Sequence, residues 1–563
     1  MDDNENNKNN NINDTANLDE MSNFLYDIIA KDIADGKYTE VHTRFPPEPN
    51  GCLHIGSAKA ILINYLAKEK FGGTFNLRFD DTNPATETDE FVNSIKEDIE
   101  WIIGEKPDNI FFGSDYFDKC YEYAVKLIKD GKAFVCDLSP DEMKEYNGDY
   151  THPGKDSPYK NRTVEENLDL FERMKNGEFP EKSKTLRAKI DMTSSNMNMR
   201  DPIIYRILYT PHYRYGNKWC IYPLYDYAHP IQDSIEEITH SMCSIEFENK
   251  RPLYDWCRDN VGIEENKKPH QYEFARMNVS GTVLSKRHLI KLVESKAVDG
   301  WDDPRMPTFM GLRRRGFTPS AIREFIIRAG VSKVYNNVDI KLLEFCQRNE
   351  LNKTAERRIA ILEPVPVIIT NYPEDKTEQF DVSNNPEDEN AGTRTVEFSR
   401  YLYIDKSDFE GNPPPKFFRL TPGGEVRLMG SYIIKCEEII KNPDGSIKEI
   451  LCTYDPETGG KNPLDGRKIK GTIHWLSKNN AEKININLYD YLFSSEITDD
   501  KNYAEHLNPN SILEYKECLL EKGVLESDAG ERFQFVRMGY FYKDSKYDRT
   551  YNRIVTLKDS YKP

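Results

Sequence analysis

The residues best suited to binding phosphate lie in the stretch 41–57. His54 and Ser57 are three residues apart, directly after the turn pair Asn50-Gly51. They stand where an apolar pattern typical of a helix begins, and free backbone N–H groups at a helix start attract anions. Read from its residues alone, the stretch indicates a phosphate site. A histidine at such a position also fits a capping or packing role, and this alternative stays open at this point.

The elements that must position these residues follow from the pattern on either side. Residues 41–44 alternate apolar and polar side chains, which predicts a half-buried strand, and prolines then break it. A helix should run from Leu53 to the stop at Gly72-Gly73. The alternation in 74–80 predicts the next strand of a βαβ unit, with Asp80 at its carboxyl end, where ligands bind in open α/β sheets. Asp80 or Asp81 could instead cap the next helix.

The rest of the chain changes character three times. Residues 115–225 carry Pro-Gly and Ser-Pro turns and a helical run from Thr163, and they look like an insertion between two halves of a nucleotide-binding sheet. Helical sequence dominates from about 287 to 355, with Thr318-Pro319 starting one helix as N-cap and first residue. Short alternating strands with turn signals follow from about 364, which predicts one or two β-barrels.

Composition narrows the class of protein. The 563 residues are 38% hydrophobic, enough for several globular domains, and no run approaches the roughly 20 apolar residues of a membrane span. The N-terminus lacks a signal-peptide core, so we expect a cytoplasmic protein. The ten cysteines show no C-x-x-C spacing, which argues against zinc and disulfides. Residues 1–21 are rich in Asn and acidic side chains and should form a disordered tail.

The net charge of −18 speaks only weakly against a nucleic-acid partner, because binding depends on where charges lie. Residues 1–20 alone contribute six acidic residues and one Lys. Basic clusters occur at 313–315, 357–358 and 467–470. Each cluster, taken alone, fits a solvated face better than a contact.

The stretch 41–57 can be interpreted together with a second stretch, Val283-Leu-Ser-Lys-Arg287. With His54-Ile-Gly-Ser57 it resembles the paired signature motifs of class I aminoacyl-tRNA synthetases. Ser57 replaces the second histidine of that motif. The resemblance is to the glutaminyl-tRNA synthetase family and covers residues 22–563. It is carried by Arg44-Phe-Pro-Pro-Glu-Pro-Asn-Gly51, Asn76-Leu-Arg-Phe-Asp-Asp-Thr-Asn-Pro84, Arg200-Asp-Pro202, Gln271-Tyr-Glu-Phe274, Gly300-Trp-Asp-Asp-Pro-Arg-Met-Pro-Thr308 and Ile473-His-Trp475.

The resemblance implies a multidomain α/β plus all-β protein. A Rossmann-like catalytic domain is split by an insertion that binds the tRNA acceptor stem, and a helical connector and two C-terminal β-barrels that read the anticodon follow. The boundaries expected here are a tail at 1–21, catalytic halves at 22–114 and 225–286, the insertion at 115–224, the connector at 287–354, a proximal barrel at 355–400 and 480–563, and a distal barrel at 401–479.

The reaction implied is activation of L-glutamine by ATP to an adenylate, followed by transfer to the terminal 2′-hydroxyl of tRNA(Gln). Negative charge then builds on the phosphates, which calls for positioned cations and N–H donors. By resemblance His54 and Lys286 are catalytic, and Lys286 lies on a loop that closes over the phosphates. Mg²⁺ should accompany ATP, with no ligands identified. The ATP-binding set is Glu48, Pro49, Asn50, His54, Ile55, Gly56, Ser57, Ala58, Lys59, Ala60, Ser244, Arg276, Met277, Leu284, Ser285 and Lys286.

Five residues should hold glutamine: Arg44 at the carboxylate, Asp80 at the α-ammonium, and Tyr225, His229 and Gln271. Without the resemblance, Tyr225 fits core packing better. Glutamyl-tRNA synthetases share fold and motifs, but a pocket for glutamate must neutralise a desolvated carboxylate and needs a cation. Relatives of that type place an Arg where this chain has Cys243, which favours glutamine.

The resemblance also assigns contacts to tRNA. Tyr150 stands where relatives carry an apolar wedge at the first acceptor base pair, and Asn249 where many have Asp. Arg357, Arg419, Arg427, Gln534 and Arg537 align with anticodon contacts, and Arg and Gln suit base edges. Met429 replaces a frequent Arg. We expect a monomer. The alternatives are a nondiscriminating glutamyl-tRNA synthetase, an inactive tRNA-binding paralogue, and an adenylyltransferase that acts without RNA.

Overall fold

The computed structural model describes residues 23–85, 88–494, 503–528 and 530–558, so the predicted tail at 1–21 lies outside the described residues. The chain divides into two compact units. The first comprises Met1–Val279 with Arg323–Val338, and the second comprises Ser280–Ile322 with Asp339–Pro563.

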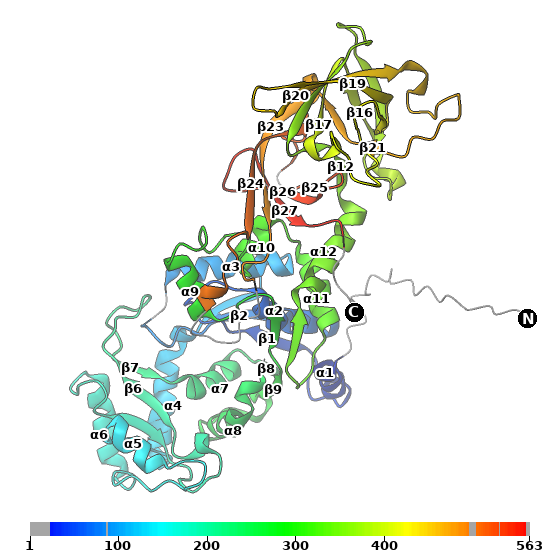
Figure 1. Ribbon diagram of the computed structural model, residues 1–563. Helices are drawn as coiled ribbons and strands as arrows, with labels where there is room; N and C mark the ends of the chain where they lie inside the picture. The colour runs from blue at the N-terminus through cyan, green and yellow to red at the C-terminus, as the bar shows by residue number, and fades with distance from the viewer. Residues whose placement is uncertain (1–22, 86–87, 495–502, 529, 559–563) are drawn as a thin grey trace, which may run out of the picture. The chain divides into compact units, whose positions relative to one another are not determined.

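A parallel sheet with helices between its strands forms the centre of the first unit (Figure 1). The strand, turn and helix predicted around His54 are β1 (Val41–Phe45) and α2 (Ile55–Phe71), and Gly72 ends the helix as predicted. β2 (Gly73–Phe79) pairs with β1 in parallel, which confirms the βαβ unit, and β3 (Asn109–Phe112) pairs with β2. The remaining elements here are α1 (Phe24–Ala34), α3 (Asp89–Ile103), α7 (Tyr225–Ile235), β8 (His240–Ser244), α8 (Arg251–Asn260) and β9 (His270–Phe274).

Strands β8 and β9 form a separate two-stranded sheet beside β1. They are parallel to each other, and the Thr239 N–H donates to the carbonyl of His42 at 3.0 Å. This hydrogen bond, directly before β8, sets the β8–β9 pair beside β1, so that parallel strands lie next to one another as in a doubly wound nucleotide-binding fold. The prediction that residues 41–44 form a half-buried strand was wrong. The polar residues Arg44 and Arg78 are 0% and 1% exposed, because parallel strands are covered on both faces.

The insertion between β3 and α7 forms its own antiparallel sheet, in the order β4-β5-β6-β7. Its core contains Phe171, Leu186 and Tyr205. The helix predicted from Thr163 is present, and Thr163 Oγ1 accepts from the Glu166 N–H at 3.2 Å. The elements are α4 (Phe117–Lys129), β4 (Ala133–Cys136), α5 (Pro140–Asn147), α6 (Val164–Lys175), β5 (Thr185–Ala188), β6 (Ile203–Ile207) and β7 (Ile221–Pro223).

Helices then dominate as predicted. Thr318 caps α11, accepting from the Ala321 N–H at 3.2 Å, and Pro319 is the first helical residue. The elements are β10 (Met277–Ser280), α9 (Lys286–Glu294), α10 (Phe309–Arg315), α11 (Pro319–Ala329), β11 (Asn336–Asp339) and α12 (Ile340–Thr354).

The predicted all-β half consists of two nearly closed seven-stranded sheets, ordered β12-β25-β26-β27-β23-β24-β13 and β21-β18-β19-β20-β14-β17-β22, with a separate hairpin β15-β16. The two sheets divide after Ile361, since β14 pairs with β17 and β20, whereas the sequence boundary was drawn at 400/401. The strands are β12 (Glu356–Arg358), β13 (Ala360–Ile361), β14 (Pro364–Ile369), β15 (Glu378–Ser383), β16 (Thr393–Phe398), β17 (Tyr401–Asp405), β18 (Glu425–Leu428), β19 (Ile433–Lys441), β20 (Ile447–Asp455), β21 (Thr472–Ile473), β22 (Trp475–Ser477), β23 (Ala481–Tyr489), β24 (Ile512–Glu521), β25 (Arg532–Phe535), β26 (Gly539–Lys543) and β27 (Thr550–Val555).

Candidate active site

A cavity of about 470 Å³ lies at the carboxyl ends of β1, β2, β8 and β9, the edge where open α/β sheets bind ligands. Ten of the residues singled out from the sequence line it: Glu48, Gly56, Lys59, Ala60, Asp80, Tyr225, Cys243, Ser244, Arg276 and Met277. Seven lining residues escaped the sequence reasoning: Phe45, Pro46, Asn64, Met242, Phe247, Lys250 and Phe274. Phe45 and Phe274 end strands and could have been found by that position.

His54 is the N-cap of α2. Its Nδ1 accepts the Gly56 N–H at 3.1 Å, which places the proton of the neutral ring on Nε2. Ser57 is half-buried, and its N–H donates to the His54 carbonyl at 2.8 Å. The capping role left open from the sequence is therefore present, and it orients the ring. Neither residue lines the cavity, and neither do Pro49, Asn50, Ile55 and Ala58.

Lys59 is a buried cation on the cavity wall. Its side chain is 1% exposed, and its Nζ donates to the carbonyl of Ala275 at 2.9 Å. Among the described residues no carboxylate pairs with it. Burial lowers its pKa to about 8, which leaves most of the charge in place at neutral pH. An ammonium without a counter-ion suits an anionic ligand.

Arg276 lies at the same end of the cavity as Lys59. Its Nη1 pairs with Glu246 at 2.9 Å, and its side chain is 60% exposed. Met277, the first residue of β10, is buried. Arg276 can turn toward a ligand because the carboxylate that pairs with it, Glu246, is exposed, and such surface pairs are weak.

Below the cavity, Arg44 belongs to a fully buried ion network. Its guanidinium donates to Asp233 at 3.1 and 3.2 Å and to the carbonyl of Met242 at 2.9 Å. Arg78 donates to the same carboxylate at 2.7 Å. Burial alone would raise the pKa of Asp233, but the Arg44 and Arg78 guanidinium groups hold it well below its usual range. The structure does not place Arg44 on the cavity wall.

His229 joins this network and is neutral. Its Nε2 lies 2.5 Å from Arg44 Nη2, and burial lowers its pKa to about 4 despite the nearby Asp233. The ring stacks on Tyr225, with centroids 4.9 Å apart. His229 therefore supports the wall that Tyr225 lines. Tyr225 is half-buried and lines the cavity, and its role in binding stays a prediction.

Asp80, Cys243 and Gln271 differ in their access to the cavity. Asp80 accepts from Thr82 Oγ1 at 3.0 Å, and burial raises its pKa to about 6, so it is mostly ionised at neutral pH. Burial raises the pKa of the Cys243 thiol to about 12, which keeps it neutral. Gln271 is buried behind the wall and donates to Glu273 Oε1 at 3.0 Å.

Glu273 is the direct register partner of Cys243 in the β8–β9 pair. It is 1% exposed and bonded to Arg251 Nη1 at 2.6 Å. Near Cys243, the cations Arg44 and Arg251 are thus already paired with buried carboxylates, and Lys250 of the cavity wall is paired with Asp226 at 3.0 Å. This part of the cavity suits an uncharged group.

Lys286 is the first residue of α9, and Ser285 is its N-cap. Leu284 is half-buried, in the segment that leads into the helix. These three residues belong to the second compact unit, whereas every residue lining the cavity belongs to the first.

The residues expected to contact the tRNA acceptor stem lie on the surface of the first unit. Tyr150 is 89% exposed in a turn that is braced by the buried Arg200, whose Nη1 donates to the carbonyls of Asn147, Asp149 and His152 at 2.8–3.1 Å. Asn249 is exposed, and its carbonyl accepts from Asn196 Nδ2 at 2.7 Å. Arg200 belongs to the motif Arg200-Asp-Pro202, but its hydrogen bonds to this turn could not be predicted from the sequence.

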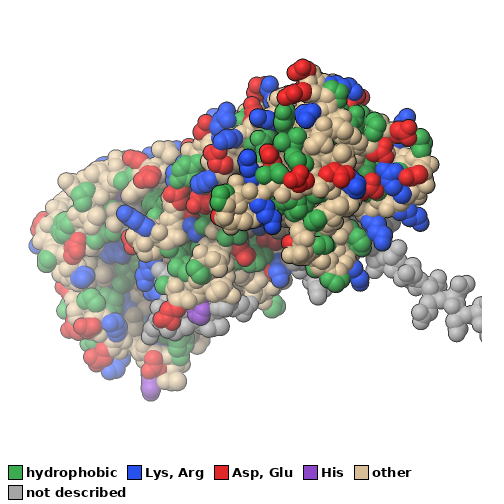
Figure 2. All heavy atoms as spheres, turned by 45° about the horizontal axis from the view of Figure 1, so that its top comes forward, with side chains coloured by type: hydrophobic (Ala, Val, Ile, Leu, Met, Phe, Trp, Pro, Cys, Tyr) green, Lys and Arg blue, Asp and Glu red, His purple; other side chains and the backbone are tan. Residues whose placement is uncertain are grey.

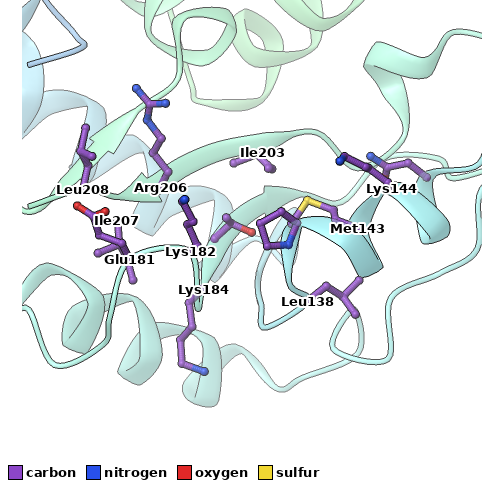
Figure 3. Close-up of a pocket in the computed structure, with 13 residues that line it drawn as sticks. Leu138, Met143, Lys144, Glu181, Lys182, Lys184, Ile203, Arg206, Ile207 and Leu208 are labelled. Atoms are coloured by element: carbon purple, nitrogen blue, oxygen red, sulfur yellow. The ribbon is translucent and has the colours of Figure 1, made fainter. Parts of the chain in front are cut away.

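A second cavity, of about 400 Å³, lies in the insertion (Figure 3). Its lining combines apolar side chains such as Met143 and Ile203 with the charged residues Glu181, Lys144, Lys182, Lys184 and Arg206, and Lys184 is paired with Asp137 at 2.7 Å.

The anticodon candidates lie in the two C-terminal sheets. Arg357 on β12 and Gln534 on β25 are direct register partners. Arg537 follows β25, and its Nη1 donates to Asp408 at 2.7 and 2.8 Å. Arg419 also pairs with Asp408, at 3.4 Å. Arg427 on β18 donates to the carbonyl of Lys461 at 2.8 Å and lies apart from these. On the face drawn in Figure 2, Lys and Arg side chains are interspersed with Asp and Glu, so no uniformly acidic surface opposes an anionic partner there.

Within the described part of the chain, no group of three or more His, Cys, Asp or Glu side chains is arranged to hold a metal ion. No helix among the described residues is long and apolar enough to cross a membrane.

Comparison with known proteins places these sites in context. Residues 40–353 match the family model described as tRNA synthetases class I (E and Q), catalytic domain, and residues 355–455 and 472–544 match two models described as anti-codon binding domains of those enzymes. The chain is 53% identical over 553 residues to "Glutamine--tRNA ligase" of Clostridium kluyveri, covering 96% of this chain and 98% of the relative. It is 51% identical to the enzyme of that name from Clostridium perfringens, covering 97% and 100%. A solved glutamate tRNA ligase from Elizabethkingia meningosepticum is 19% identical, over 55% of this chain and 70% of that chain, with a TM-score of 0.41.

Proposed function

Because this chain belongs to the class I tRNA synthetases of the E and Q type, we propose that it is a glutamine--tRNA ligase. It activates L-glutamine with ATP and transfers the product to the terminal 2′-hydroxyl of tRNA(Gln), releasing AMP and diphosphate. The observation that carries the proposal is a sequence identity of about 50% to relatives named glutamine--tRNA ligase, over nearly their full length. The protein works as a cytoplasmic monomer.

In the first step, glutamine lies in the cavity at the ends of β1, β2, β8 and β9. Asp80 meets the α-ammonium group, since it is ionised at neutral pH and lines the wall. Tyr225 supplies a hydroxyl group to the side chain of the bound glutamine. Arg44 acts indirectly, because its donors already bind Asp233 and the Met242 carbonyl. Through these bonds it holds β8, and hence Cys243, in place.

ATP occupies the end of the cavity near Lys59 and Arg276. His54 donates from Nε2 to a phosphate, Lys59 offsets its charge, and Arg276 with Met277 contacts the base. Lys286 stabilises the charge that builds on the α-phosphate and the leaving diphosphate. Mg²⁺ arrives with ATP as part of the substrate and needs no cluster of protein carboxylates.

The tRNA contacts divide between the two units. The insertion at 115–224 takes the acceptor stem, with Tyr150 as an aromatic wedge and Asn249 at the minor groove. The cations beside apolar side chains in its second cavity favour a nucleic-acid partner. Arg357, Arg419, Arg427, Gln534 and Arg537 read the anticodon, supported by the anticodon-domain matches over 355–455 and 472–544.

A nondiscriminating glutamyl-tRNA synthetase is the second candidate, and the neutral thiol of Cys243 in the cavity wall argues against it. Charging assays with a tRNA(Gln) transcript distinguish the two. The proposal expects glutaminyl-tRNA to form and glutamate to be used at least roughly a hundredfold less efficiently, the scale at which a buried unpaired charge is rejected. Comparable charging with glutamate would favour the second candidate.

A further inference from the structure

Asp408 is a buried carboxylate at the end of the short turn that follows β17. It is 0% exposed. Arg537 Nη1 donates to both of its oxygens, at 2.7 and 2.8 Å. Arg419 Nε lies 3.4 Å from Oδ1, and His474 Nδ1 lies 3.7 Å from Oδ2. Two of the arginines proposed to read the anticodon thus share one anion.

The cluster joins the two C-terminal sheets. Asp408 and Arg419 lie on the segments between β17 and β18 of the second sheet, and His474 lies between β21 and β22. Arg537 comes from the turn between β25 and β26 of the first sheet. It adopts a left-handed backbone conformation, with φ of 68°. A non-glycine residue keeps such a conformation only where its surroundings enforce it.

His474 supports the arrangement. It is 4% exposed, and burial lowers its pKa, although the nearby Asp408 opposes the shift. The neutral ring can therefore accept a hydrogen bond at Nδ1, which lies 3.4 Å from Arg537 Nη1. Three hydrogen-bond contacts fix one nitrogen of Arg537.

The other guanidinium nitrogens are left to donate. Within the described part of the chain, Nε and Nη2 of Arg537 and Nη2 of Arg419 have no hydrogen-bond partner, while Arg419 Nη1 donates to the Ser407 carbonyl at 2.6 Å. The side chains are 30% and 37% exposed. A guanidinium anchored through part of its donors by a buried carboxylate presents its remaining N–H groups from a defined position, as base-edge recognition requires.

We propose that Asp408 is a positioning residue for anticodon recognition, orienting Arg419 and Arg537 from two different sheets so that both read bases together. The inference rests on the proposed function. It predicts that loss of the Asp408 charge weakens base discrimination, and that the effect passes through Arg537.

The test compares Asp408→Asn with wild type in aminoacylation of tRNA(Gln) transcripts. One transcript, called the unmodified transcript below, has the original anticodon sequence, and each of the others has one anticodon base replaced. Asp408→Asn should lower kcat/KM for the unmodified transcript by roughly tenfold, mainly through KM, and should shrink the penalty for replaced bases. KM for ATP and for glutamine should not change. The matched control is Asp465→Asn, which removes an exposed carboxylate of the same region that lies 2.7 Å from Arg467.

Combination with Arg537→Ala shows whether the two residues act as a unit. The inference expects Asp408→Asn to add little in that background. Equal losses on every transcript, or full additivity with Arg537→Ala, would overturn it. Should Asp408→Asn fail to fold, Asp408→Glu keeps the charge but displaces it, and unchanged discrimination in that variant would overturn the inference as well. A wild-type protein that does not charge the unmodified transcript would instead refute the proposed function.

Discussion

Replacing Cys243 with arginine tests the choice between glutamine and glutamate. The thiol lines the cavity and stays neutral, because burial raises its pKa to about 12. Nearby, Arg44 is paired with Asp233 at 3.1 Å and Arg251 with Glu273 at 2.6 Å. Lys250 of the cavity wall is paired with Asp226 at 3.0 Å, so near Cys243 a glutamate carboxylate would meet cations that already have partners, whereas the amide of glutamine needs none.

The magnitude follows from the charge that the new side chain supplies. A hydrogen bond to a charged group contributes about 1.5–3 kcal/mol, which corresponds to roughly a ten- to 150-fold change in relative affinity. Glu273 is the register partner of Cys243 and will attract part of the new guanidinium. We therefore expect the lower end, a fall of roughly tenfold in the ratio of kcat/KM for glutamine over glutamate.

The assay is aminoacylation of one tRNA(Gln) transcript with each amino acid in parallel. Cys243→Ser is the control, because it keeps a small neutral side chain and should leave the ratio near the wild-type value. A folded Cys243→Arg protein with an unchanged ratio would refute the reasoning. So would a Cys243→Ser protein whose ratio falls as far as that of Cys243→Arg.

Three further substitutions test other parts of the account. Lys286→Ala should slow adenylate formation roughly 10²- to 10³-fold in single-turnover assays, the loss of about 2.7–4 kcal/mol from one transition-state contact; a change within threefold would exclude the role. In wild type, KM for ATP should rise as pH increases through about 8, where Lys59 loses its proton, and this rise should be absent in Lys59→Met; a rise retained by the variant would assign it to another group. Asp233→Asn leaves the Arg44 and Arg78 guanidinium groups without their shared anion and should lower the free energy of unfolding in urea by about 3–5 kcal/mol. Because the folded pKa of Asp233 is depressed, this contribution should be present above about pH 4 and lost as pH falls further; a difference between the two proteins that stays constant from pH 7 to pH 3 would contradict it.

The fold could be predicted from the sequence wherever residues close together in the chain determine the local structure. The β1–α2 turn followed from prolines, an Asn-Gly pair and helical periodicity within thirty residues, and Asp80 could be placed because it directly follows a strand. The burial of Arg44 could not be predicted, since its partner Asp233 lies 189 residues away. The division of the two barrels failed at β14 for the same reason, because its parallel pairing with β20 joins Val367 to Ile450.

The cavity shows the same limit. Lys250 lines the cavity although nothing in its sequence neighbourhood marks it, because it is the last residue of the 3-10 helix Ile245–Lys250 that follows β8. The Asp408 cluster likewise depends on Arg537, which lies 129 residues away. Motif resemblance named both arginines of that cluster but not the carboxylate that holds them, since a shared counter-ion leaves no periodic pattern.

The most direct test of the central claim is ATP–pyrophosphate exchange with glutamine and with glutamate, each with and without tRNA(Gln). We predict exchange with glutamine in the presence of tRNA and little with glutamate under either condition. Exchange with glutamate at a comparable rate would contradict the assignment to glutamine. Exchange that ignores tRNA would favour an adenylyltransferase acting on a small molecule, and no exchange under any condition would leave only a tRNA-binding protein.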